Sequence, residues 1–285
     1  MDTSITAAVD VLRGQRVVVL TGAGMSTASG IPDYRGPKTR RFARNPVQFK
    51  AFVSDPEARR RYWSRAAVGW PRIAAAQPNA AHRAIAGLQR AGVVHGLITQ
   101  NVDGLHGAAG STGVELHGTL SRVRCLQCGV YESRDALQTR LLALNPALAD
   151  VTAAVAPDGD AELPEGHTEA FVMAACQACE GPLKPDVVFF GESVPADVTA
   201  AAWSAFARAQ ALLVAGSSLT VFSGYRFVRR AARDGIPVVI VNQGPTRGDP
   251  QAAVCIDADV TEVLPRLLEA LSPDDASGDR AGAVG

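Results

Sequence analysis

The chain has 285 residues, of which 47% are hydrophobic and 20% are charged, and its 28 basic residues balance its 28 acidic ones. This composition is ordinary for a folded protein with a sizeable core, and a net charge of zero gives no reason to expect a nucleic-acid partner. No apolar run approaches the roughly 18 residues that cross a bilayer, and the first expected strand comes too early for a signal or transit peptide. We therefore expect a cytoplasmic protein without a membrane span.

The charges are unevenly distributed along the chain. Residues 35–72 contain eleven Lys and Arg against only Asp55 and Glu57, whereas residues 141–183 contain seven Asp and Glu and no basic residue. The two segments therefore have fields of opposite sign, unless both are simply solvated surface.

A glycine-rich stretch, TGAGMSTASGIPDYRG, follows the first apolar run. The run Arg16–Leu20 contains three valines and predicts a buried parallel strand. Gly22, Ala23 and Gly24 then keep side chains away from the backbone, so that a phosphate could lie against N–H groups at the start of a helix. An ordinary tight turn would also explain the glycines.

The stretch departs from a common Rossmann loop in two ways. Thr27 stands where the third glycine is usual, and no acidic residue closes a second strand about 20 residues further on. Asp33 and Arg35 instead place charges inside the loop. We therefore expect this loop to take part in chemistry as well as in phosphate binding.

Two helices are predicted before the second strand. Ser54-Asp55-Pro56-Glu57 has the pattern of a capping box, which predicts a helix that runs to about Ala67. Asn79 is the expected N-cap of the next helix, and Gly92 is expected to close it. His82 on this helix is interpreted as a structural histidine.

Polar residues follow the second and third predicted strands. Val93–Thr99 is followed by Gln100, Asn101, Val102 and Asp103, and Val114–Leu116 is followed by His117 and Gly118. Open parallel sheets bind ligands at the carboxyl ends of their strands. A histidine in such a place can act as a general base near neutral pH, so we interpret His117 as the candidate base.

Four of the five cysteines form two C-x-x-C pairs, namely Cys125 with Cys128 and Cys176 with Cys179. Such pairs can close a tetrahedral four-thiolate zinc site, which has no position left for water and is therefore structural. The 47 residues between the pairs exceed the usual spacing, and we interpret residues 145–166 as an acidic loop inserted there. Metal binding in a reducing compartment fits these cysteines better than a disulfide scaffold.

The rest of the chain predicts further alternation of strands and helices. Asp186–Glu192 is expected to return to the sheet, and Ala211–Ala215 is a strand that ends in Gly216, Ser217 and Ser218. The remaining predictions are a helix over 222–233, a strand over 238–241 ending in Asn242, a strand over 254–257 with Cys255 buried, a helix over 260–271 and a disordered tail over 272–285.

The predicted fold class is α/β. A Rossmann-like parallel sheet formed by about residues 8–35, 93–120 and 186–271 makes the large domain. A small domain is inserted into it, with a helical part over about 36–92 and a zinc module over about 121–185.

These motifs together resemble the sirtuins, NAD-dependent protein lysine deacylases, over about residues 8–271. The resemblance rests on GAGMSTASGIPDYR, TQNVD, His117-Gly118, the two cysteine pairs, DVVFFGE, GSS and Asn242. Tyr62-Trp63-Ser64-Arg65, Gly69-Trp70-Pro71 and the long insert are most similar to class II sirtuins. The resemblance implies a single catalytic domain over residues 1–285.

The resemblance also implies the reaction and the residues that carry it. The acyl oxygen of the modified lysine attacks the nicotinamide ribose, nicotinamide leaves, and free lysine and O-acyl-ADP-ribose are released. The catalytic residues implied are His117, Asn101 and Asp103. NAD is the co-substrate, and the residues implied for its binding are Gly22, Ala23, Gly24, Ser26, Asp33, Arg35, Gln100, Asn101, Val102, Asp103, Gly216, Ser217, Ser218, Asn242, Gln243, Gly244 and Val260.

The implied partner is an acyl-lysine protein or peptide, which binds as an added strand between residues 188–192 and the segment after Ser218. In sirtuins that prefer succinyl chains, a tyrosine and an arginine spaced like Tyr62 and Arg65 hold the distal carboxylate. We therefore expect acyl groups longer or more acidic than acetyl, unless Arg65 faces solvent or pairs with the acidic insert.

Two other classes of function fit parts of the sequence. An ADP-ribosyltransferase would use the same NAD pocket to modify a protein nucleophile. A non-catalytic NAD-binding or zinc-ribbon interaction module would need the loops and the cysteines but not His117, a base that pure binding does not require.

Overall fold

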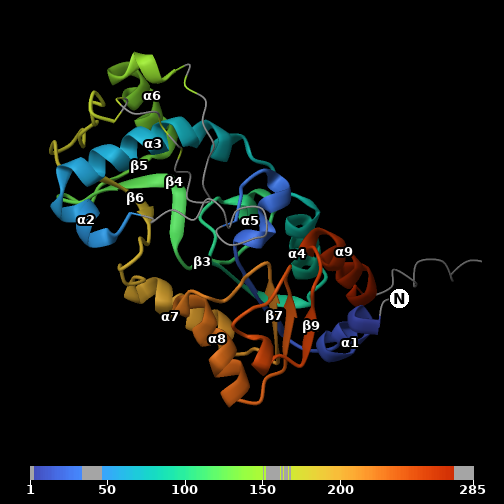
Figure 1. The fold of residues 1–285 in the computed structure, drawn as a ribbon. Coiled ribbons are helices and arrows are strands. Elements are labelled where there is room, and N and C mark those ends of the chain that lie inside the picture. Colours follow the sequence, from blue (N-terminus) through green and yellow to red (C-terminus); the bar gives the residue numbers. More distant parts are fainter. Residues whose placement is uncertain are drawn as a thin grey trace, which may run out of the picture.

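The computed structural model describes residues 3–33, 47–149, 151, 161, 163, 166 and 168–272, and it contains a six-stranded and a three-stranded sheet (Figure 1). Arg35 lies outside these residues, and so does the predicted tail except for its first residue, Ser272. Within the described part of the chain, no helix combines the length and the apolar character that a membrane span requires.

The six-stranded sheet is parallel throughout, with the strand order β3-β2-β1-β7-β8-β9. Its strands are β1 (Val17–Thr21), β2 (Val94–Thr99), β3 (Val114–Glu115), β7 (Ala211–Ala215), β8 (Val238–Val241) and β9 (Val254–Ile256). From the centre of the sheet, the chain order proceeds toward one edge through β1, β2 and β3 and toward the opposite edge through β7, β8 and β9. The switch point therefore lies between β1 and β7, where open parallel sheets bind ligands.

Helices cover both faces of this sheet because successive strand residues point to opposite sides. Val17 and Val19 pack against α1 (Thr3–Leu12), α4 (Ala80–Arg90) and α9 (Val260–Leu271). Val18 and Leu20 pack against α7 (Ala196–Phe206) and α8 (Phe222–Arg233) on the other face. The predicted α/β class with a parallel sheet is confirmed.

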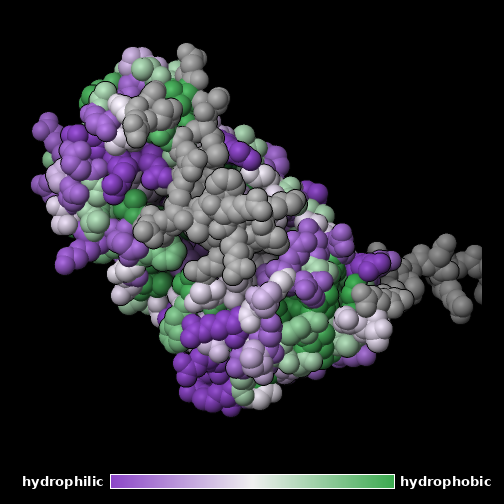
Figure 2. Space-filling model, in the orientation of Figure 1, coloured by the Kyte–Doolittle hydropathy of each residue, from purple (hydrophilic) through white to green (hydrophobic). Residues whose placement is uncertain are grey.

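The three-stranded sheet is antiparallel and has the order β5-β4-β6. Its strands are β4 (Gly118–Cys125), β5 (Tyr131–Ser133) and β6 (Leu183–Val187), and its neighbours are α2 (Phe49–Ser54), α3 (Pro56–Ala75) and α6 (Arg134–Leu144). The short helices are α5 (Leu105–Ala108) and 3-10 turns over Ala23–Met25, Thr27–Ser29, Pro146–Leu148 and Asp249–Gln251. Hydrophilic residues gather over α2 and α3 and over α8 (Figure 2).

The prediction that Asp186–Glu192 returns to the main sheet was wrong. Asp186 and Val187 belong to β6, which pairs with β4 in the three-stranded sheet. The chain then turns at Phe189–Glu192, where the Glu192 N–H donates to the Phe189 carbonyl at 3.0 Å and Gly191 has a φ of 81°. The apolar residues of this segment therefore lead into a turn and not into a buried parallel strand.

Helix α3 begins and ends later than predicted. Ser54 is the last residue of α2, and the N-cap of α3 is Asp55, whose Oδ1 accepts the Glu57 N–H at 2.9 Å. The helix continues through Pro71 to Ala75. Pro71 has no N–H for the carbonyl of Ala67 four residues earlier. That carbonyl instead accepts the Gln138 amide from α6 at 2.7 Å, which explains how the helix tolerates the proline.

Helix α4 starts as predicted at the N-cap Asn79, whose side chain accepts the backbone N–H groups of Ala81 and His82. His82 completes the cap because its Nδ1 accepts the Asn79 N–H at 3.4 Å. The structural interpretation of His82 agrees with this contact.

Cys255 is exposed, and the prediction that it is buried was wrong. It lies in β9, which is an edge strand of the six-stranded sheet. Ile256 points to the buried side, so its neighbour Cys255 points away from it. The Cys255 thiol lies 3.8 Å from Asp249 Oδ1.

Candidate functional site

The glycine-rich loop after β1 packs directly against the loop after β7. The Gly24 N–H donates to the Gly216 carbonyl at 2.8 Å, and the Gly22 N–H donates to the Ala215 carbonyl at 3.2 Å. A Cβ atom on Gly22 would lie 2.7 Å from Ser217 Cβ, and one on Gly24 would lie 2.9 Å from Gly216 Cα. Only glycine fits this close approach, so the two loops pack backbone against backbone at the carboxyl ends of β1 and β7.

The segment after β1 does not continue into the α-helix that the sequence predicted. It forms the two short 3-10 turns, Ala23–Met25 and Thr27–Ser29, and Gly30 ends them with a φ of 85°. Ser26 lies between the turns and is buried. Asp33 is half-buried at the end of the described part of this loop.

Residues 100–103 join the ends of β1, β2 and β7 through side chains. Gln100 Nε2 donates to Ser217 Oγ at 2.8 Å and to the Thr21 carbonyl at 3.2 Å. Asn101 Nδ2 donates to Ser26 Oγ at 3.1 Å, and Ser26 Oγ donates to Asp103 Oδ2 at 2.6 Å. The structure thus places these polar side chains in one network.

His117 lies at the rim of this network, between the end of β3 and the start of β4 at Gly118. Its Nδ1 lies 3.0 Å from the Gln100 carbonyl, and its Nε2 lies 2.7 Å from Ser223 Oγ on α8. Burial of the ring lowers the pKa of His117 below its ordinary value, the hydrogen bond to Gln100 opposes this shift, and the positive charge of Arg226 adds to it. The imidazole is therefore neutral near pH 7 and able to accept a proton.

Ser223 was missed by the sequence analysis. It is separated from His117 by 106 residues, and only the packing of α8 onto the sheet, where it contacts β7 and β8, brings the two together. The one sequence signal was a hydroxyl in the first turn of the helix predicted over 222–233.

The remaining predicted NAD-binding residues follow β7, β8 and β9. The Ser218 carbonyl accepts the Arg247 N–H at 3.0 Å. Asn242 Nδ2 donates to the carbonyls of Gln243 and Gly244, both at 3.0 Å. Val260 is the first residue of α9. These residues lie at the same carboxyl edge as the glycine loop, whereas Val102 is fixed through its carbonyl, which accepts the Leu120 N–H at 2.8 Å.

Two buried histidines lie behind the glycine loop. The rings of His82 and His106 meet edge to face with centroids 4.8 Å apart, and His106 Nε2 lies 3.0 Å from Thr21 Oγ1. Burial lowers the pKa of His82 to about 4 and that of His106 to about 3. Both rings are therefore neutral near pH 7 and serve the packing of the loop.

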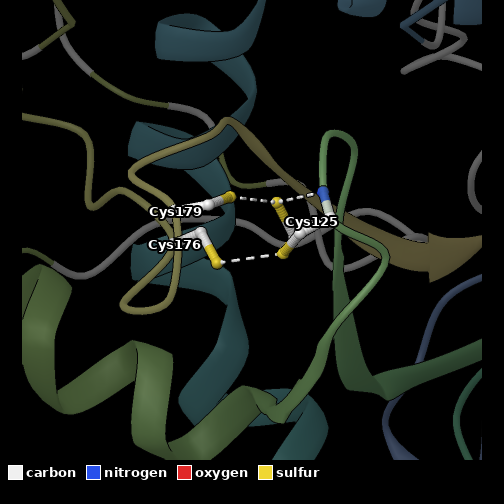
Figure 3. Close-up of side chains that lie close together, drawn as sticks. Cys125, Cys176 and Cys179 are labelled. Atoms are coloured by element: carbon white, nitrogen blue, oxygen red, sulfur yellow. Dashed lines mark hydrogen bonds between the residues drawn. The ribbon is translucent and has the colours of Figure 1, made fainter.

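The four paired cysteines come together at the end of the three-stranded sheet that lies away from His117. Figure 3 shows the sulfur atoms of Cys125, Cys176 and Cys179 pointing toward one another. The four sulfur atoms lie within 4.8 Å of one another, with Cys125 to Cys179 at 3.5 Å and Cys128 to Cys176 at 3.7 Å. A tetrahedral Zn²⁺ with Zn–S bonds of about 2.3 Å requires S···S distances of about 3.8 Å, so the site fits one zinc ion.

Tyr62 and Arg65 make separate contacts. The Tyr62 ring is buried in an aromatic cluster, 5.4 Å from the Phe52 ring and 5.3 Å from the Phe189 ring between centroids. Arg65 Nε donates to the carbonyl of Ala161 at 2.9 Å. This contact agrees with the expected alternative in which Arg65 pairs with the insert.

The Sir2 family model matches residues 22–223 of the chain. The chain is 55% identical to NAD-dependent protein deacetylase 1 of Mycobacterium avium (strain 104), over 93% of this chain and 95% of that protein. It is 47% identical to the NAD-dependent protein lipoamidase sirtuin-4, mitochondrial, of Bos taurus, over 89% of this chain and 82% of that protein. A solved Sir2 complex with a p53 peptide and NAD⁺ matches with a TM-score of 0.75 and 32% identity, over 93% of this chain and 97% of that one. The predicted resemblance is therefore confirmed, and the chain belongs to the Sir2 family.

Proposed function

We propose that this chain is an NAD-dependent protein lysine deacetylase that transfers the acyl group of acyl-lysine to ADP-ribose, with release of nicotinamide and O-acyl-ADP-ribose. The observation that carries this proposal is the position of His117, a neutral base at the rim of the polar network formed by residues 100–103. A site that only binds NAD would not need such a base beside a bare-backbone phosphate loop.

The loops at the strand ends are proposed to bind different parts of NAD. In this proposal the loops of Gly22–Gly24 and Gly216–Ser218 would hold the phosphates, and Asn242 and Val260, which follow β8 and β9, would hold the adenosine end. Gln100, Asn101 and Asp103 would hold the nicotinamide end, with Asp33 and Arg35 on the loop beside it. NAD supplies the electrophilic ribose carbon when it is bound.

The protein's own groups then have clear tasks. Asn101 and Asp103 are linked through Ser26, and this network would hold both side chains in place for the nicotinamide end of NAD. His117 would serve as the general base for a ribose hydroxyl of bound NAD, directly or through a neighbouring group. The buried position of the ring keeps it neutral until that step.

The turn at Phe189–Glu192 supports the proposal that the peptide binds as an added strand. Glu192 stabilises this turn, because its Oε2 accepts the Phe189 N–H at 2.9 Å and forms an ion pair with the buried Lys184 at 3.0 Å. The Phe190 side chain is exposed. A peptide strand between this turn and the segment after Ser218 would be recognised mainly through backbone groups, which tolerates many sequences.

We propose the predicted division into a large and a small domain, with the zinc at the outer end of the small one as a structural element. The four thiols suit a reducing compartment, and this supports the cytoplasm as the location. The zinc site is closed by four sulfur ligands and cannot activate water.

The test is an assay with acetyl-, succinyl-, glutaryl- and lipoyl-lysine peptides, in which NAD consumption, free lysine and acyl-ADP-ribose are measured together. The lipoyl peptide belongs in the set because a relative with 47% identity carries the name lipoamidase. We expect one acyl-ADP-ribose for each lysine released. Transfer of labelled ADP-ribose to protein without acyl release would favour the ADP-ribosyltransferase instead.

A further inference from the structure

The ring of His117 is hydrogen-bonded at both nitrogens. Nδ1 lies 3.0 Å from the Gln100 carbonyl oxygen, which can only accept, so Nδ1 carries the hydrogen. In the neutral ring, Nε2 is therefore the nitrogen with the free lone pair. Ser223 Oγ lies 2.7 Å from Nε2, so the serine hydroxyl donates to that lone pair.

This arrangement leaves no second acceptor site on the base. An imidazole nitrogen has one lone pair, so a ribose hydroxyl and Ser223 cannot both donate to Nε2. The oxygen of Ser223 still has two lone pairs when its hydrogen faces His117. Ser223 is only half-buried, so the residue is not sealed off from a molecule bound at the rim of the site.

The packing of α8 fixes the distance between Ser223 and His117. Gly224 lies against the side chain of Gln100, and a Cβ atom at Gly224 would collide with the Gln100 amide. Gln100 also supplies the carbonyl that holds His117 Nδ1. The same residue therefore positions both partners of the short Ser223–His117 contact.

We propose that Ser223 is a catalytic proton relay between the ribose hydroxyl of NAD and His117. The inference depends on the proposed function, since it concerns the step in which the base acts. The ribose O–H bond breaks and an O–H bond forms at Ser223, while the original Ser223 O–H bond breaks and an N–H bond forms at His117 Nε2. Ser223 is neutral before and after, His117 becomes imidazolium, and the electron pair of the ribose O–H bond remains on the ribose oxygen as the nucleophile.

The first test compares two steps of the reaction: nicotinamide release, which does not use the base, and acyl-ADP-ribose formation, which does. Ser223→Ala should lower acyl-ADP-ribose formation by about 10- to 100-fold, because the relay is part of general-base catalysis. Exchange of labelled nicotinamide into NAD, which precedes that step, should stay within about threefold. Ser223→Thr keeps the hydroxyl and should retain most of the activity, and Ser204→Ala, at an exposed serine of α7, is the matched control.

A double variant tests whether the two residues act as one unit. His117→Ala with Ser223→Ala should be no slower than His117→Ala alone, because the relay has no acceptor once the imidazole is removed. A further loss of tenfold or more in the double variant would contradict the relay, since Ser223 would then act independently of His117.

The second test needs no NAD and uses the free protein. In ¹⁵N spectra, His117 of the wild type should show a protonated Nδ1 and a hydrogen-bonded Nε2. In Ser223→Ala the Nδ1 hydrogen should remain, and the Nε2 resonance should move to the position of a free acceptor. An unchanged Nε2 resonance in Ser223→Ala would show that Ser223 does not donate to Nε2, and the relay would then be wrong.

The outcomes keep this inference separate from the proposed function. If Ser223→Ala forms acyl-ADP-ribose at the wild-type rate, the ribose hydroxyl displaces Ser223 and the relay is wrong. If nicotinamide exchange falls as much as product formation, Ser223 has a structural role only. Absence of NAD-dependent deacylation in the wild type would instead overturn the proposed function and the relay with it, whereas the spectra would still decide the hydrogen bond.

Discussion

The two ligand-holding regions of this molecule are stabilised by different forces. In the first region, Gly22–Gly24, Gly216–Ser218 and Asn242 follow β1, β7 and β8, in which every residue is buried. The cysteine site lies at the ends of β4 and β6 and beside β5, and both β4 and β5 have exposed residues. The first region is therefore formed by apolar packing before any ligand arrives. The second also has a buried apolar cluster, which includes Cys125 and Cys176, but its four sulfur atoms in addition need an ion to enclose.

The chemistry of the two sites reinforces this difference. The amide nitrogens of Gln100 and Asn101 and the carboxylate of Asp103 have protein partners in the absence of NAD. Four thiolates within 4.8 Å of one another would repel each other without a cation. Loss of the metal should therefore damage the cysteine region and spare the region around His117.

The largest effect is expected from removal of the zinc. Cys176→Ser should abolish the binding of one zinc ion per chain and cost several kcal/mol in the stability of the three-stranded sheet, because metal binding is coupled to folding. Metal analysis and hydrogen exchange should show zinc loss and weaker protection of β4, β5 and β6, with β1 and β7 still protected. Cys255→Ser is the control, since this exposed thiol lies outside the cluster. Active, freshly purified protein without zinc would contradict the assignment.

The second prediction concerns the other region. His117→Ala should leave the fold and NAD binding nearly intact and should lower deacylation by about 10² or more, because the general base is removed. Calorimetric NAD titration and product analysis measure the two effects separately. His95→Ala, at an exposed histidine of β2, is the control. A His117 variant with more than half of the wild-type rate would show that another group is the base.

Much of the first region could be predicted from the sequence, because its strands are short runs of buried apolar residues between clear helices. The bounds predicted for Ala211–Ala215, 222–233 and 238–241 agree with β7, α8 and β8. The residues proposed to bind NAD all follow such strands, so that the parallel sheet brings those in the described ranges to one edge.

The second region was harder to predict for physical reasons. Strand β4 has a mixed burial pattern without a regular period, and β5 has three residues, so neither gives a hydrophobic signal. Asp186 and Val187 were assigned to the wrong sheet, because the apolar residues that follow them resemble a buried parallel strand. Ser223 was missed because its partner is 106 residues away, and a tertiary contact of this kind leaves no local pattern.

The third prediction uses acid to weaken the apolar-packed region. The pKa values of His82 and His106, about 4 and 3, lie below the ordinary 6.5, so the unfolded chain binds protons at a pH where the folded protein does not. Stability is complete above pH 6.5 and is lost as the pH falls toward these values, by as much as about 1.4 kcal/mol per pH unit for each histidine.

Urea unfolding at pH 7 and pH 5.5 measures this loss, and zinc analysis at each pH shows whether the metal is retained. His106→Asn should have a smaller pH dependence than the wild type. An equal pH dependence in this variant, with zinc still bound, would mean that other groups cause the acid sensitivity.

The smallest effect is expected at Arg65, which connects α3 to Ala161 through a 2.9 Å hydrogen bond. If this contact is its main role, Arg65→Met should reduce stability by about 1 kcal/mol, which is typical of one hydrogen bond. The ratio of kcat/KM for succinyl-lysine over acetyl-lysine peptides should then change by less than about threefold, or roughly 0.6 kcal/mol. Were Arg65 to hold the distal carboxylate, Arg65→Met would instead lower this ratio by about tenfold to a hundredfold, because a charge-assisted pair contributes roughly 1.5–3 kcal/mol. Arg61→Met, at an exposed position of the same helix, corrects for the general loss of positive charge. A tenfold loss of activity with the succinyl peptide that is seen in Arg65→Met and not in Arg61→Met would show that α3 contacts the acyl chain. The region of the three-stranded sheet would then contribute to substrate choice as well as to metal binding.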